Sequence, residues 1–169
     1  DRILSLMKRG YTVADFKEKI RLLRSVRPDI LIASDFIVGF PGETEKDFEE
    51  TIKIIKEIKF DYSYSFIYSP RPGTPAAELD DDIPLSIKKI RLKKIQELLK
   101  KQGNKFSEGM INTTQYILIT GPSKNPGYVV GRPASNRIVH IKGDLLTDLG
   151  TIKKVLVKKS KGQSLTAEA

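Results

Sequence analysis

The chain has 169 residues, a formal net charge of +9, a single histidine and no cysteine. Without cysteine it can form no disulfide and can supply no thiolate ligand to an iron–sulfur cluster, and one histidine cannot build a zinc site. The sequence contains no apolar run long enough to cross a bilayer and no signal-peptide pattern, so we expect a cytoplasmic protein without a membrane segment.

Helical spacing and cap residues predict the first two helices. Apolar side chains recur at helical spacing from Ile3 to Met7, and Gly10 is the expected C-cap. Thr12 with Asp15 forms a capping signal for a second helix, which must end before Pro28.

An apolar strand, expected from Ile30, runs directly into a tight turn within residues 35–44. Gly39 and Gly42 permit positive φ angles and close approach of another group to the backbone, and Pro41 stiffens the turn between them. In α/β folds such a turn lies at the carboxyl end of a strand, where ligands bind. We therefore expect a group to approach this backbone closely.

Alternation of strand and helix continues after the turn. Thr44 with Asp47 resembles a capping box and opens a helix to about Lys59, and residues 62–68 alternate as another strand. This order is typical of a parallel sheet with crossover helices, although two strands cannot close a barrel.

A loop paced by prolines, residues 69–76, follows the second strand and contains Arg71. The carboxyl ends of parallel strands meet at one edge of a sheet. Tyr68 and Arg71 are therefore expected to lie near whatever approaches Gly39.

An acidic triplet, Asp80 to Asp82, precedes a long helix expected over about residues 86–107. Near the start of a helix, acidic residues more often cap the helix and complement its dipole than bind a metal. No metal site is predicted.

From Gln115 onward, short apolar runs at 116–119, 128–130, 138–141 and 152–157 are separated by Gly, Pro, Asn and Ser. Such spacing is typical of a small OB-like β-barrel. We expect two domains, an α/β part over residues 1–110 and an all-β part over residues 111–169.

Positive charge is concentrated in the second of these parts. Residues 1–110 carry 21 Lys and Arg against 18 Asp and Glu, whereas residues 111–169 carry 9 against 3, which gives +3 and +6. This asymmetry favours a polyanionic partner, with nucleic acid ahead of membrane because no basic amphipathic helix accompanies it. The alternatives are a lysine-rich solvated surface and protection of exposed strand edges. The candidate RNA-binding residues are Lys124, Arg132, Arg137, Lys142, Lys159 and Lys161.

Segments 1–12, 35–44 and 68–76, in this order and spacing, resemble the radical-SAM tRNA methylthiotransferases. Segments 121–124, 131–132, 136–140 and 162–165 are similar to the C-terminal TRAM domain of that family. The resemblance covers nearly the whole chain. It implies an α/β fold in which a partial (βα) radical-SAM barrel is followed by a small all-β, OB-like TRAM barrel, as in the last third of such an enzyme.

The function implied by the resemblance is methylthiolation of C2 of isopentenyladenosine next to the tRNA anticodon. The cofactors implied are S-adenosyl-L-methionine (SAM) and two 4Fe-4S clusters, whose cysteine ligands are not in this chain. The partner implied is tRNA, through its anticodon stem-loop. The chain alone is expected to be inactive, with no catalytic residue. A ribosomal-protein methylthiotransferase and a non-catalytic RNA-binding module are the alternatives.

The resemblance also implies roles for individual residues. The cofactor-binding set is Arg9, for the SAM carboxylate, and Ile37, Val38 and Gly39, whose backbone would meet the SAM adenosine. The set that lines the substrate pocket is Asp35, Tyr68 and Arg71.

Purely structural roles remain open for several of these residues. Gly39 can serve only the turn, Arg9 can complement the end of a helix, and Tyr68 can be a core or rim aromatic. We interpret His140, on an expected strand, as an ordinary surface residue.

Overall fold

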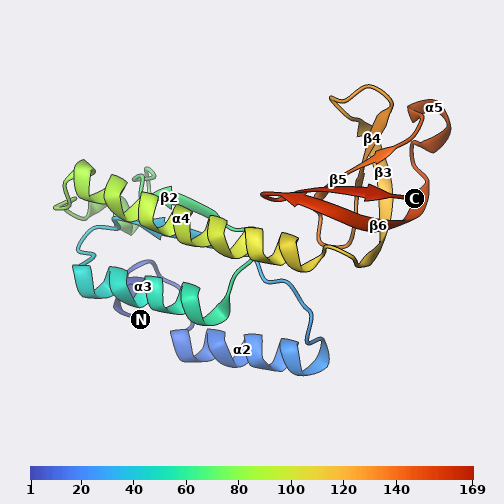
Figure 1. The fold of residues 1–169 in the computed structure, drawn as a ribbon. Helices are drawn as coiled ribbons and strands as arrows, with labels where there is room; N and C mark the ends of the chain where they lie inside the picture. The colour runs from blue at the N-terminus through green and yellow to red at the C-terminus, as the bar shows by residue number, and fades with distance from the viewer. The chain divides into compact units, whose positions relative to one another are not determined.

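A computed structural model describes residues 1–169, and the chain divides into two compact units, residues 1–99 and residues 100–169. The division falls within one long helix, α4 (Figure 1). The elements up to and including that helix are α1 (Arg2–Leu6), α2 (Val13–Val26), β1 (Asp35–Val38), α3 (Glu45–Ile58), β2 (Tyr64–Ile67), the 3-10 helix η1 (Pro75–Glu78) and α4 (Leu85–Gly109).

Local capping chemistry fixes where α2 and α3 begin. The Thr12 hydroxyl accepts a hydrogen bond from the Asp15 N–H at 3.1 Å, and the Asp15 carboxylate accepts one from the Thr12 N–H at 2.9 Å. Thr44 and Asp47 repeat this reciprocal arrangement at α3. Both predicted capping boxes are therefore confirmed, and together they satisfy backbone donors that a helix start leaves free.

Two predicted boundaries in the first unit are wrong. Helix α1 ends at Leu6, and the left-handed residue that follows it is Lys8, with φ 56°, instead of Gly10. The strand expected from Ile30 begins only at Asp35. The segment before it makes irregular contacts, such as the hydrogen bond from the Asp61 N–H to the Ile32 carbonyl, so no regular ladder forms there.

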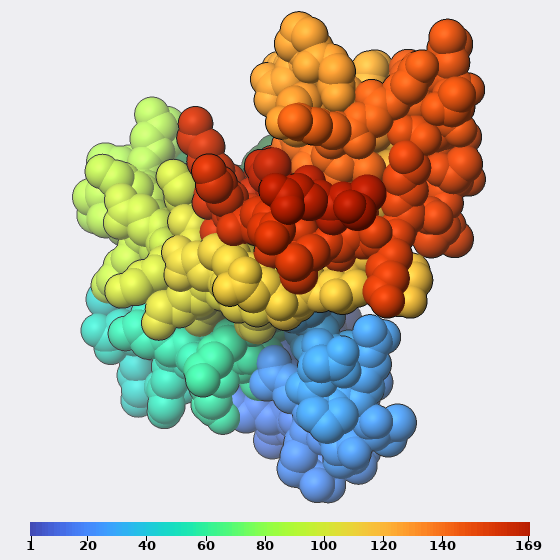
Figure 2. Space-filling view, turned by 45° about the vertical axis from the view of Figure 1, so that its right-hand side comes forward, coloured from blue at the N-terminus to red at the C-terminus, as the bar shows by residue number.

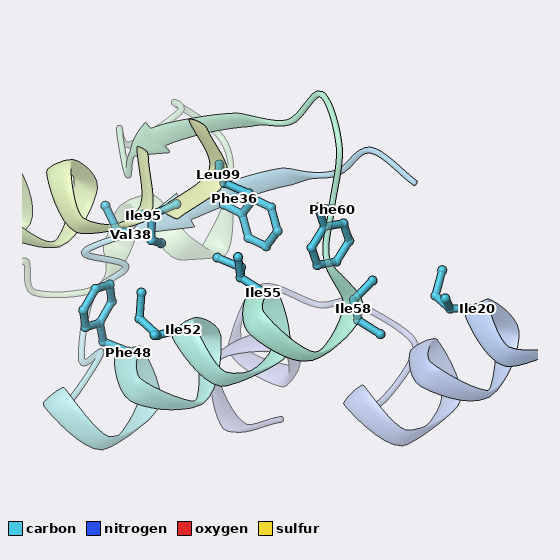
Figure 3. Close-up of a cluster of buried hydrophobic side chains, with 10 residues drawn as sticks. All are labelled: Ile20, Phe36, Val38, Phe48, Ile52, Ile55, Ile58, Phe60, Ile95 and Leu99. Carbon is cyan, nitrogen blue, oxygen red and sulfur yellow. The ribbon is translucent and has the colours of Figure 1, made fainter. Parts of the chain in front are cut away.

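Strands β1 and β2 form a parallel two-stranded sheet with Phe36 opposite Ser65 and Val38 opposite Ile67. Alternation along β1 buries Phe36 and Val38 and leaves Asp35 and Ile37 exposed. The buried side chains pack with residues of α3 and of the first part of α4, and Figure 3 shows this core. Its members are Ile20, Phe36, Val38, Phe48, Ile52, Ile55, Ile58, Phe60, Ile95 and Leu99.

The second unit is a closed five-stranded barrel in the order β3-β4-β5-β7-β6. Its elements are β3 (Thr114–Pro122), β4 (Tyr128–Arg132), β5 (Ile138–Lys142), the short helix α5 (Leu145–Asp148), β6 (Ile152–Lys161) and β7 (Ser164–Glu168). All neighbours pair antiparallel except β5 and β7, which are parallel. Residues near the C-terminus, drawn in red, lie on the visible surface in the space-filling view (Figure 2).

Each strand of the barrel contributes its inward-facing, alternate side chains to the core. Its buried residues are Ile117, Ile119, Val129, Val139, Ile141, Val155, Val157, Leu165 and Ala167. The four strands expected from the apolar runs are confirmed, and so is the predicted barrel. The fifth strand, β7, was not predicted, because Leu165 and Ala167 alone are too short a pattern to stand out.

No helix of the structure is both long and apolar enough to cross a bilayer.

Candidate functional site

The turn after β1 is closed by hydrogen bonds within the turn itself. Gly39 and Gly42 have φ angles of +67° and +75°, a region that favours glycine. The Glu43 N–H donates to the Phe40 carbonyl at 2.9 Å, and the Gly39 N–H donates to the Glu43 carboxylate at 2.8 Å. Two hydrogen bonds between residues of the turn therefore stabilise its conformation.

The close approach predicted at Gly39 is made by a side chain of this chain. A Cβ atom on Gly39 would lie 2.5 Å from Cγ and 2.7 Å from Cδ of Lys88, on α4. The Lys88 stem cannot swing aside freely, because the residue is buried and its ammonium contacts both carboxylate oxygens of Asp81 at 2.5 Å. The requirement for glycine at this position thus has a cause inside the chain, independent of any ligand.

A buried ion pair joins the same turn to α4. Glu43 and Arg91 are 5% and 6% exposed, and Nη1 of Arg91 lies 2.8 Å from the Glu43 carboxylate. Nη1 also donates to the Glu43 carbonyl at 3.0 Å, and Nη2 contacts Glu45 at 3.1 Å. Burial raises the pKa of Glu43, although the Gly39 N–H and Arg91 oppose the shift.

The outer side of the turn is tied to α1, α3 and the acidic triplet. Arg2 bonds the Gly42 carbonyl and the Asp47 carboxylate, and the Gly42 N–H donates to Asp82 at 3.1 Å. Burial opposes ionisation of Asp47, but hydrogen bonds from Arg2 and Thr44 outweigh it and lower the pKa of Asp47 to about 2. No group of His, Cys, Asp or Glu is arranged to hold a metal ion.

Of the predicted cofactor residues, only Ile37 offers its side chain to solvent beside the turn, at 37% exposure. Val38 is buried and its carbonyl accepts a hydrogen bond from the Tyr68 N–H at 2.8 Å, while the Gly39 N–H is bound to Glu43. Arg9 is exposed after α1, and no side-chain contact fixes its guanidinium.

The predicted pocket residues lie at the carboxyl end and on the open face of the sheet. The Tyr68 hydroxyl donates to the Ala76 carbonyl at 2.8 Å, and its ring meets the Phe40 ring edge-on at 5.0 Å. Tyr68 therefore braces the proline-paced loop. Arg71 is exposed in that loop, and Asp35 is exposed on β1.

An aromatic row on the open face of the sheet was missed by the sequence reasoning. Tyr62, Tyr64 and Phe66 are 50%, 54% and 53% exposed, with ring centroids 5.4 Å and 6.4 Å apart along the row. Tyr64 lies opposite Asp35, and Phe66 lies opposite Ile37. The alternation of residues 62–68 contained this signal, but it was used only to predict a strand. The face presents aromatic and apolar surface with one carboxylate beside it.

In the barrel unit, five of the six predicted RNA-binding cations are exposed, namely Lys124, Arg132, Lys142, Lys159 and Lys161. Arg137 is the exception and requires a correction. It is 5% exposed, and it donates from Nε to the Ser107 hydroxyl at 3.0 Å and from Nη2 to the Gly103 carbonyl at 3.3 Å. These contacts bind the end of α4 within the barrel unit, so Arg137 is not available to a phosphate.

The exposed cations lie on different strands and loops of the barrel. Lys142 lies opposite Tyr128 across β4 and β5, whereas Lys159 and Lys161 lie on β6 opposite residues of β7. Arg132 donates to the Asn136 carbonyl at 2.7 Å. Strand β6 pairs with β3 over residues 152–156 and with β7 over residues 156–161. Lys159 and Lys161 therefore lie where only β7 pairs with β6, and protection of a strand edge stays open as an alternative role for them.

His140, the single histidine, is half-buried on β5. Its Nδ1 lies 2.9 Å from the Ser123 hydroxyl. This contact ties β5 to the turn after β3.

Comparison with known proteins connects the two units with two families. Residues 108–169 match the TRAM domain, and residues 1–55 match the radical SAM superfamily. A tRNA-2-methylthio-N(6)-dimethylallyladenosine synthase of Coxiella burnetii (strain RSA 331 / Henzerling II) is 52% identical over 171 residues, and the synthase of Francisella tularensis subsp. novicida (strain U112) is 52% identical over 169 residues. Each alignment covers 99% of this chain and 38% of the relative, so the chain spans little more than a third of the length of these relatives.

Proposed function

Since the chain belongs to the radical-SAM, TRAM-containing tRNA methylthiotransferases, as its sequence implied, we propose that it acts as part of an enzyme that methylthiolates C2 of isopentenyladenosine next to the tRNA anticodon. In this proposal residues 1–110 complete the SAM and substrate pocket, and residues 111–169 bind tRNA. The observation that carries it is the 52% identity along 99% of the chain, which runs through both units. The relatives' names favour a tRNA substrate over a ribosomal protein.

The residues present do not fit an iron–sulfur cluster. The chain has no cysteine, and no cluster of potential metal ligands exists in its structure. Any cluster that takes part in the proposed reaction is held by residues outside this sequence, and this chain contributes binding and positioning.

The open sheet face fits the adenosine of SAM better than the turn backbone does. Ile37, with Phe66 opposite, offers exposed apolar surface for a purine, and Asp35 offers an acceptor for hydroxyl groups. The Gly39 N–H is already occupied by Glu43, which leaves it unable to serve as the donor. Arg9 is proposed for the SAM carboxylate because a guanidinium can hold a planar anion through two hydrogen bonds.

The cofactor part of the proposal is tested by titrating SAM into the isotopically labelled chain and following backbone amide resonances. Amides of Ile37 and Phe66 should shift, whereas amides on the exposed face of α2 should not. Uniform or absent shifts would remove these residues from the cofactor set.

The tRNA part rests on the exposed cations of a closed barrel. Fluorescence anisotropy of a labelled anticodon stem-loop should show binding by the whole chain that weakens steeply between about 50 mM and about 200 mM salt, because phosphate contacts release counterions. Replacing both Lys159 and Lys161 with Gln should reduce the salt slope by roughly 2, or about 1 per lost contact.

A matched control replaces Lys46 and Lys53 on α3 with Gln, which removes the same charge from the other unit. Its salt slope should equal that of the wild type. RNA binding that is absent, or insensitive to salt, would contradict the tRNA part of the proposal.

A further inference from the structure

The outer surface of strands β3 and β6 combines an aromatic ring, aliphatic side chains and a cation. The ladder places Tyr116 opposite Lys154 and Leu118 opposite Ile152. Tyr116 is 64% exposed and Ile152 is 71% exposed. We define the β3–β6 face as Tyr116, Leu118, Ile152, Lys154 and Leu156.

Folding of the barrel does not explain this composition. The alternating residues Ile117, Ile119, Val155 and Val157 are the ones that fill the core. Strand edges are protected by charged residues and proline, whereas four of the five residues of this face are apolar or aromatic, so edge protection does not account for them. Large apolar side chains gathered on an outer surface, with a cation among them, therefore point to an interaction.

The charge beside the face indicates an anionic partner. Strand β6 contains five lysines and no acidic residue. Lys153 is paired with Asp148 at 2.7 Å and Lys158 with Glu168 at 3.3 Å, whereas Lys154, in the middle of the face, has no ion pair. An exposed tyrosine directly opposite an unpaired lysine offers a nucleic acid both a ring for a base and a charge for a phosphate.

We propose that the β3–β6 face binds unpaired RNA nucleotides, with a base stacked on the Tyr116 ring and the adjoining phosphate held by the Lys154 ammonium. Leu118 and Ile152 then cover the apolar part of the same nucleotide or of its neighbour. The proposal rests on the proposed function, because it specifies how the barrel holds RNA. Bases inside a duplex are already stacked, so this face prefers a loop or a single strand to paired RNA.

The test measures affinity of the whole chain for a hairpin with an unpaired loop and for a fully paired duplex of the same length. Tyr116→Ala should weaken loop binding about 5- to 150-fold, the range for loss of one aromatic stacking partner, and leave duplex binding unchanged. Tyr116→Phe keeps the ring and should bind the loop like the wild type. Both substitutions lie on an exposed side chain, and thermal unfolding of each variant verifies that the barrel is intact.

Lys154→Gln provides a second, independent measurement. It should lower the salt slope for loop binding by about 1. Lys46→Gln, which removes an exposed charge from α3, should leave the slope unchanged.

The outcomes separate this proposal from the proposed function. If the wild type binds RNA with a steep salt dependence and Tyr116→Ala binds the loop equally well, the face assignment fails and the proposed function stands. If Tyr116→Ala weakens binding of the loop and of the duplex equally, the proposed stacking of an unpaired base on Tyr116 is wrong. If Tyr116→Ala abolishes self-association of the chain without changing RNA affinity, the face is a protein interface and the proposal is overturned. If the wild type binds no RNA, the tRNA part of the proposed function fails together with it.

Discussion

Substitution of Gly39 by alanine tests whether the glycine is required by the chain itself. The left-handed backbone, with φ +67°, costs an alanine about 1–2 kcal/mol. The new Cβ would also lie 2.5 Å from Cγ of Lys88, whose ammonium is held by Asp81, and such overpacking costs about 1–3 kcal/mol. The expected loss of stability is therefore about 2–5 kcal/mol.

Gly73 supplies a matched control for the backbone contribution. Its φ is +78°, and nothing lies within 4 Å of the Cβ that an alanine would add. Gly73→Ala should therefore cost only the conformational part, about 1–2 kcal/mol. The difference between the two alanine variants isolates the contact with Lys88.

The assay is urea denaturation followed by far-ultraviolet circular dichroism, which reports mainly on the helices of residues 1–99. In a Lys88→Ala background the cost of Gly39→Ala should fall, because the atoms that clash are gone. Equal costs for Gly39→Ala and Gly73→Ala, or an unchanged cost in the Lys88→Ala background, would refute the steric reasoning. The positive φ angle alone would then account for the glycine at position 39.

Three further predictions concern the charged contacts. Because the pKa of Asp47 is about 2 when folded and about 3.9 when unfolded, its contribution to stability is complete above about pH 4 and is lost as the pH falls through about 2. In thermal unfolding, Asp47→Asn should thus have a lower melting temperature than the wild type at neutral pH, and the two melting temperatures should converge near pH 2. A difference in melting temperature that does not change with pH would contradict this pKa assignment. Arg91→Ala should cost about 3–5 kcal/mol in urea denaturation by leaving Glu43 buried and unpaired, and adding Glu43→Gln should recover part of the loss. Arg137→Ala should lower the melting temperature without changing the salt slope of RNA binding, and a reduced slope would return it to the RNA surface.

Features set by neighbours in the sequence were predictable, and those set by distant contacts were not. Thr12 and Asp15 predict where their helix begins, because both partners of the capping box lie within one turn of the chain. Burial of Arg137 has no local signature, since its partner Ser107 is 30 residues away and its position on a strand resembles that of any exposed cation.

The same limit applies to the turn after β1. The glycines at 39 and 42 predicted a crowded backbone, and the structure confirms positive φ angles at both. The sequence could not identify the crowding group, because Lys88 has no local feature that distinguishes it from other helical lysines. Its contact with Gly39 exists only in the folded chain. For the candidate site, sequence alone indicated which loops lie at the sheet edge but missed the exposed aromatic row on β2.

The order of strands in the barrel bears on when this unit can fold during synthesis. Strand β7 is the last of the five to leave the ribosome, yet it lies between β5 and β6 and pairs with both. Until residues 164–168 emerge, β5 and β6 each carry an unsatisfied row of amides and carbonyls, open to pairing with another nascent chain. The barrel is therefore completed only after its final strand has been translated, whereas the parallel pair β1 and β2 and the helix α3 between them are made much earlier.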